Sequence, residues 1–190
     1  MSWAYAAFAA FRELVHFVLS LTVMPPGGEV VLQTGPRGRD RGNLVGRIGS
    51  DRVPLNDGRW LRVLVQLYLD AADGGKLKVD KSLFQYQLDE EAERWVFRYD
   101  YLRNPEDQHP SSHVQVRGIF TEEDVVPTRG TLARVHFPTG RVGVEAIVRL
   151  LVEQFGVATN ALPQVWRPVL AETETGFLRI AHRNVSGPRA

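Results

Sequence analysis

The chain contains no cysteine among its 190 residues. This absence excludes disulfide bonds, thiolate nucleophiles, iron–sulfur clusters and thiolate-ligated zinc sites in this chain. Any metal site would have to be built from histidine and carboxylate ligands alone. The chemistry available is therefore that of histidine, carboxylate, hydroxyl and cationic side chains.

Lysine is also scarce, and arginine supplies most of the positive charge. Of the 23 cationic side chains, only Lys76, Lys78 and Lys81 are lysines. The planar guanidinium group binds phosphate or carboxylate better than an ammonium group does, although a GC-rich codon usage would also favour arginine. The formal net charge is +1, so no overall field attracts nucleic acid or a membrane. An electrostatic argument must rest on local clusters.

No long apolar run is free of charged residues. The most apolar segment, residues 3–24, carries Arg12, Glu13 and His16 and has neither a cationic leader nor a small-residue cleavage site. These features argue against a transmembrane span and against a secretory signal. We therefore expect a cytoplasmic protein with no membrane partner.

Residues 2–21 have apolar side chains at helical spacing, with Ser2 as a candidate N-cap. The prolines and glycines of residues 25–28 end the predicted helix. Its polar face is narrow. Such a helix is either buried in its own fold or pairs with a second copy of the chain. One alternative function is therefore a non-enzymatic protein that forms a homodimer, or docks a partner, through this helix.

The middle of the chain reads as consecutive strands joined by short turns, an arrangement typical of an antiparallel meander. A helical stripe over residues 144–155 and a further short helix within residues 162–181 follow the strands. The sequence predicts one α+β domain over residues 1–183, an antiparallel β-meander sheet with the N-terminal helix and the C-terminal helices packed on one face, and a disordered tail over residues 184–190. The predicted strands cover residues 29–33, 43–48, 60–70, 76–88, 94–102, 112–120 and 131–137.

Strand alternation gathers polar residues on one surface of the last three predicted strands. If Val114 and Val116 point to the core, then His113 must point the other way. The same argument applied to each of these strands predicts a shared polar surface. Its members are Arg98, Asp100, His113, Gln115, Arg117, Arg134 and His136, with His109 at the rim.

Two imidazoles beside arginines are suited to metal-independent cleavage of a phosphodiester. One histidine takes a proton, the other gives one, and the guanidinium groups hold the charge on the phosphate. We therefore expect binding or cleavage of a phosphate-bearing ligand such as RNA, by an RNase-like phosphodiesterase if the chain is an enzyme. A solvated sheet face without function is the open alternative. The candidate catalytic residues are His113, His136 and Asp100, and the candidate phosphate-binding residues are Arg98, Arg117, Arg134 and Arg141.

A metal centre is less compatible with the pattern. His109 and His113 are four residues apart, but Pro110 opposes a helix there, and on a strand they would lie about 13 Å apart. We expect no metal and no cofactor.

The sequence offers two alternative hypotheses for a binding site. The Gly/Arg loop over residues 35–47 carries Arg37, Arg39, Arg41 and Arg47 and could contact phosphates. A twisted sheet capped by helices can also leave a cavity for a small molecule. The aromatic residues that could line it are Tyr68, Phe84, Tyr86, Trp95, Phe97 and Tyr99.

The runs HPSSHVQV at residues 109–116 and VHFPTGR at residues 135–141, followed by an apolar helix, carry a resemblance. Over about residues 60–156 the chain resembles uncharacterised bacterial proteins with a His-bearing strand pair, and it is distantly similar to toxins of bacterial toxin–antitoxin pairs that act on RNA. The resemblance implies an RNA-directed activity. The chain departs from the pattern at Ser111 and Ser112, where such toxins would have a denser histidine cluster.

Overall fold

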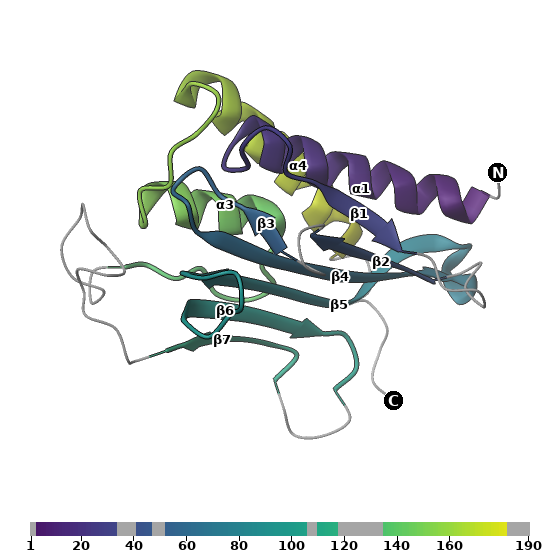
Figure 1. Cartoon of the computed structure of the whole chain (residues 1–190). Coiled ribbons are helices and arrows are strands. Elements are labelled where there is room, and N and C mark those ends of the chain that lie inside the picture. The colour runs from purple at the N-terminus through teal and green to yellow at the C-terminus, as the bar shows by residue number, and fades with distance from the viewer. Residues whose placement is uncertain (1–2, 34–40, 47–51, 106–109, 118–134, 182–190) are drawn as a thin grey trace.

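The predicted α+β arrangement is confirmed by a computed structural model, which describes residues 3–33, 41–46, 52–105, 110–117 and 135–181. Three helices lie on one face of a twisted antiparallel sheet (Figure 1). The helices are α1 (Trp3–Leu21), α3 (Val144–Glu153) and α4 (Pro163–Ala181), with a short 3₁₀ helix η1 (Ala71–Asp73). The strands are β1 (Val30–Gln33), β2 (Arg41–Gly46), β3 (Arg52–Pro54), β4 (Trp60–Asp70), β5 (Lys76–Gln87), β6 (Trp95–Leu102) and β7 (Ser112–Val116).

The described strands follow the order β1-β2-β4-β5-β6-β7, and β3 pairs with β4 beside β2. Every pairing is antiparallel. The sheet is therefore largely a meander, as predicted. Strands β6 and β7 lie at the side of the sheet away from α1, and α1 lies close to β1 (Figure 1).

The longest pairing, between β4 and β5, shows why these strands could be predicted from the alternation of side chains in the sequence. Buried and partly exposed side chains alternate along β4, as expected for a sheet with one face against a hydrophobic core. The register shifts where Gln66 pairs with Lys81 and Leu67 pairs with Val79, so Asp80 is the extra residue of a bulge. The irregularity predicted at residues 81–82 therefore lies one residue C-terminal to the observed bulge.

Helix α1 packs against the rest of the chain through one face. Phe8, Val15, Val18 and Leu19 are buried, whereas Phe17 on the outer side is 51% exposed. The homodimer through this helix stays a prediction. Helix α4 is 19 residues long and continues past Pro168, so it is much longer than the short helix that the sequence indicated.

Two asparagines connect the C-terminal end of α1 to distant loops. The side-chain amide of Asn160 donates to the carbonyls of Ser20 at 2.7 Å and Met24 at 2.6 Å. The amide of Asn56 donates to the Asn160 side chain at 3.0 Å and to the Thr22 carbonyl at 3.2 Å. These bonds pair the Ser20 carbonyl in the last turn of α1 and two carbonyls just beyond it, and they fix the loop before α4 against α1.

No helix among the described residues has the length and hydropathy that a membrane crossing requires. Several sequence predictions concern residues outside the described ranges. They are the tail over residues 184–190, most of the Gly/Arg loop with Arg37, Arg39 and Arg47, and the candidate site residues His109 and Arg134.

Candidate functional site

The structure brings together three of the predicted residues on the sheet face opposite the helices. The β6–β7 register pairs Asp100 with His113 and Arg98 with Gln115. The Arg98 Nε donates to Asp100 Oδ2 at 2.6 Å, and the same oxygen lies 3.6 Å from His113 Nε2. The Gln115 Nε2 lies 3.3 Å from His113 Nε2. The carboxylate therefore lies within ion-pair distance of this imidazole when the imidazole is protonated.

His136 does not belong to this group. Phe137, the next residue, packs on Phe97 and Phe155, and the backbone N–H of His136 contacts Gln154 Oε1 at 3.5 Å, just after α3. These contacts place residues 136–137 on the helix side, whereas strand alternation places His113 on the other side. The described part of the predicted strand, residues 135–137, is not a strand.

Val114 and Val116 have the predicted orientation, but the expectation that they lie in the core needs a correction. They pair with Tyr99 and Phe97 and share the helix-facing side of the sheet, but they are 39% and 42% exposed. The sheet extends one strand beyond the helices that cover it, as Figure 1 shows for β7. Of the two remaining predicted arginines, Arg117 donates to the Glu93 carbonyl and lies over the Trp95 ring, and Arg141 lies on the helix side.

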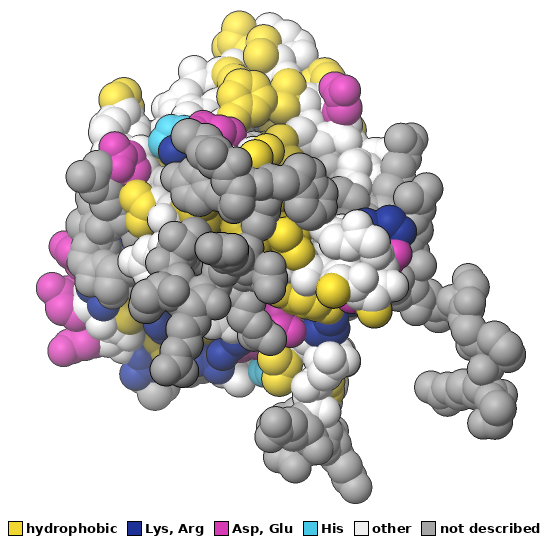
Figure 2. All heavy atoms as spheres, turned by 90° about the vertical axis from the view of Figure 1, so that its right-hand side faces the viewer, with side chains coloured by type: hydrophobic (Ala, Val, Ile, Leu, Met, Phe, Trp, Pro, Cys, Tyr) yellow, Lys and Arg dark blue, Asp and Glu magenta, His cyan; other side chains and the backbone are white. Residues whose placement is uncertain are grey.

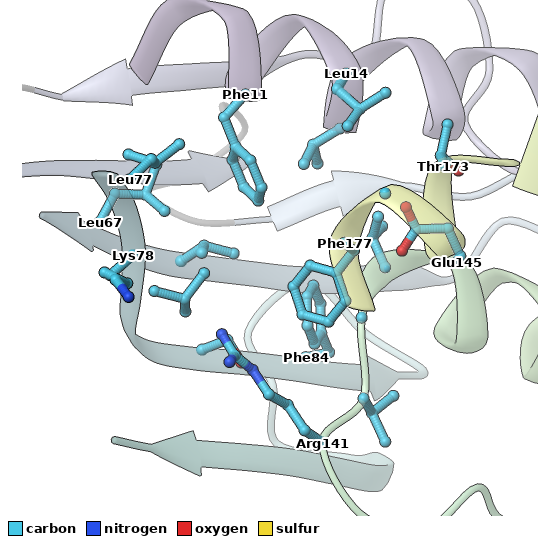
Figure 3. Close-up of a pocket in the computed structure, with 18 of the residues that line it drawn as sticks. Phe11, Leu14, Leu67, Leu77, Lys78, Phe84, Arg141, Glu145, Thr173 and Phe177 are labelled. Atoms are coloured by element: carbon cyan, nitrogen blue, oxygen red, sulfur yellow. The ribbon is translucent and has the colours of Figure 1, made fainter. Parts of the chain in front are cut away.

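Between the helices and the sheet lies an apolar cavity of about 220 Å³. Helix α1 contributes Phe11 and Leu14, β4 and β5 contribute Leu67 and Phe84, and α4 contributes Phe177 (Figure 3). Gly176 of α4 also lines this space, and a Cβ added there would have no neighbour within 4 Å. The sequence left a cavity open as an alternative, and of the six aromatic residues named for it only Phe84 lines this one.

Two arginines enter the cavity wall. The Arg141 guanidinium lies 4.4 Å from the ring centre of Tyr101 and 5.1 Å from that of Phe177. Burial, together with the nearby charge of Arg103, lowers the pKa of Arg141, although arginine keeps its proton in proteins. The Arg103 Nε donates to the Val79 carbonyl at 2.9 Å. Neither arginine forms an ion pair with a carboxylate of a described residue.

The other cation of the wall, Lys78, is already paired. Its Nζ lies 2.7 Å from Asp73 Oδ2, and Lys76 contacts the other carboxylate oxygen. The hydrogen bonds from these two lysines lower the pKa of Asp73 to about 2. The excess positive charge at the cavity is therefore that of the arginines.

A buried carboxyl group lines another part of the cavity. Glu145, in the first turn of α3, is 2% exposed, and burial raises its pKa. In Figure 3, Glu145 and Thr173 lie toward one side of the cavity, while Lys78 and Arg141 lie toward the other. On the face of the molecule shown in Figure 2, hydrophobic side chains extend from the top to the centre, and most cationic side chains lie lower.

From the sequence, Arg141 was a candidate phosphate-binding residue that was not placed in a cavity, and Arg103, Glu145 and Gly176 were not singled out. Gly176 gave a usable signal, because an isolated glycine inside a helical pattern often has a packing or functional reason. Glu145 gave a weaker signal of a functional role, since it lies beside the apolar stripe of its helix. Within the described ranges, no three metal-ligating side chains converge on one point.

No family model matches the chain, and no curated protein or solved structure matches it either. The similarity to RNA-directed toxins stays a prediction.

Proposed function

We propose that this protein binds an amphipathic small molecule in the cavity between α1, α4 and the sheet. The apolar part of the ligand fills the cavity, and its carboxylate or phosphate group lies against Arg103 and Arg141. The observation that carries the proposal is an apolar cavity with two arginines that no described carboxylate neutralises. Partly buried charges need counter-charges, and guanidinium groups bind both anions through paired hydrogen bonds.

The volume of the cavity limits the size of the ligand. An engineered apolar cavity of about 150 Å³ binds benzene, whereas drug-sized ligands occupy about 300–1,000 Å³. A cavity of about 220 Å³ fits a medium-length alkyl chain or a single substituted ring. The phosphate-bearing ligand expected for Arg141 is compatible with this site when it is a small molecule.

Calorimetric titration with octanoate, decanoate and dodecanoate, with decyl phosphate and with uncharged decanol tests the proposal. The anions are expected to bind at least about ten-fold more tightly than decanol, because a charge-assisted hydrogen bond forms only with them. The affinities for decanoate and decyl phosphate show which of the two anionic headgroups the site prefers. Equal affinity for decanol, or no binding by any probe, would rule out the proposed site.

Replacing Arg141 with methionine is expected to weaken decanoate binding by about 10- to 100-fold. The variant keeps a long side chain for Tyr101 and Phe177 but loses a charged hydrogen-bond donor, whose interaction contributes about 1.5–3 kcal/mol. The matched control is Arg167→Met, because Arg167 is exposed and pairs with Glu153 away from the cavity. Similar affinities for both variants would contradict the role of Arg141, and thermal denaturation establishes that both are folded.

A second candidate function rests on the contact of Asp100 with both Arg98 and His113. In this proposal His113, oriented by Asp100, serves as the acid–base group in metal-independent RNA cleavage. Purified His113→Ala is expected to lose any such cleavage, whereas His136→Ala keeps it because His136 lies on the other side of the sheet. Cleavage of a labelled RNA is the measurement, and an unchanged rate for His113→Ala would exclude the mechanism.

A further inference from the structure

Glu145 contributes a deeply buried carboxyl group to the cavity wall. Its side chain is 2% exposed and lies within the first turn of α3. Burial is the largest influence on its pKa and raises it, and the negative charge of Glu174 acts in the same direction. The Thr173 hydroxyl, its own backbone N–H and the charge of Arg149 act in the opposite direction but more weakly. The environment therefore favours the protonated, uncharged carboxyl group.

One oxygen of this carboxyl group has no partner among the described residues. The Oε2 atom is buried without a hydrogen bond, although buried polar atoms in proteins are nearly always paired. A Cβ added to Gly143 would lie 2.8 Å from Oε2 and 3.3 Å from the Phe177 ring. Gly143, Glu145 and Phe177 all line the cavity, so Oε2 is enclosed within the cavity wall beside Phe177.

We infer that Glu145 Oε2 is a second anchoring point for the ligand, and that the cavity selects amphipathic acids with a hydroxyl or carbonyl oxygen remote from the anionic group. This inference rests on the proposed function. The arginines hold the anionic group, the alkyl chain lies along Phe84 and Phe177, and the second oxygen bonds with Glu145. Figure 3 shows this separation of the polar groups by apolar side chains.

The test compares each simple acid with its ω-hydroxy derivative by calorimetric titration. The probes are octanoate, decanoate and dodecanoate and the three corresponding ω-hydroxy acids. At least one hydroxy acid is expected to bind about ten-fold or more tightly than its parent, because its hydroxyl satisfies a buried group that the parent leaves unpaired. If every hydroxy acid binds no better than its parent, the inference is overturned while the proposed function stands. If neither series binds, the proposed function fails as well.

Variants of the carboxyl group assign the preference to Glu145. Glu145→Leu is expected to abolish the preference for the hydroxy acid and to keep the affinity for the simple acid, whereas Glu145→Gln keeps the preference through its amide group. Preservation of the full preference in Glu145→Leu would overturn the assignment. Gly143→Ala is a second variant that leaves the carboxyl group in the chain. Its backbone φ of −91° is open to alanine, and the added methyl group presses on Oε2 and Phe177, so the preference is expected to fall there too.

Discussion

Replacing Phe97 with alanine is expected to lower the free energy of unfolding by about 3–5 kcal/mol, the usual range for a buried phenylalanine. Phe97 is fully buried in β6. Its ring centre lies 5.4–5.8 Å from those of Tyr86, Tyr99, Phe137 and Phe155. Aromatic pairs at these distances add to the stability gained from burial. The ring packs between strands β5 and β6, Phe137 and Phe155. Its removal therefore leaves a void between the sheet, the segment around residue 137 and the segment after α3.

Urea denaturation of the purified variant measures this effect. Phe97→Leu is expected to cost less, since leucine fills more of the same volume than alanine does. The matched control is Phe17→Ala on the outer face of α1, where 51% exposure predicts a change within about 0.5 kcal/mol. If Phe97→Ala and Phe17→Ala have similar midpoints and slopes, the aromatic cluster does not have the stabilising role that its geometry indicates.

Replacing Gly176 with leucine is expected to stabilise the fold and to abolish ligand binding. The glycine lines the cavity, and a side chain there meets open space. Leucine favours the helix by about 0.5–1 kcal/mol relative to glycine. Burial of its side chain is favourable by about 1.5–3 kcal/mol. The sum is an upper range, because the side chain loses rotamer freedom. We therefore expect a gain of about 2 kcal/mol together with the loss of decanoate binding.

Gly176→Ala separates the two effects. It restores most of the helix propensity but adds a single methyl group, so about 0.5–1 kcal/mol of stabilisation is expected with decanoate binding retained. Urea denaturation and calorimetric titration of the two variants provide the measurements. Decanoate binding by Gly176→Leu at the affinity of the unmodified protein would show that the ligand occupies another site.

Local patterns explain why most of the fold could be predicted. Alternation along residues 60–70 and the helical stripe over residues 144–155 each reflect one element facing one core, and neither depends on distant parts of the chain. The short distance in sequence between successive strands favoured their antiparallel pairing. The same patterns predicted that Asp100 and His113 share a face, because both lie on adjacent strands.

The parts that could not be predicted depend on packing between distant segments. Alternation shows which side of β7 carries Val114, but it does not show where the layer of helices ends. Phe137 packs into the aromatic cluster while the neighbouring His136 is exposed, and no periodicity in this segment indicates these positions. The surroundings of Arg141 include the charge of Arg103, which comes from the segment after β6, and the ring of Phe177 from α4. A ligand site built from so many separate elements has no local signature.

Helices α1 and α4, the first and last helices of the described fold, both line the cavity. The two helices are therefore synthesised far apart in time on the ribosome. Phe11 of α1 and Phe177 of α4 both line the cavity, and Asn160 bonds to Ser20, 140 residues earlier. During N-to-C synthesis the inner face of α1 therefore lacks these contacts until α4 has been synthesised. Contacts so far apart in sequence form slowly. The proposed ligand site is therefore complete only when α4 has packed against α1, and ligand binding is expected to stabilise that packing by mass action.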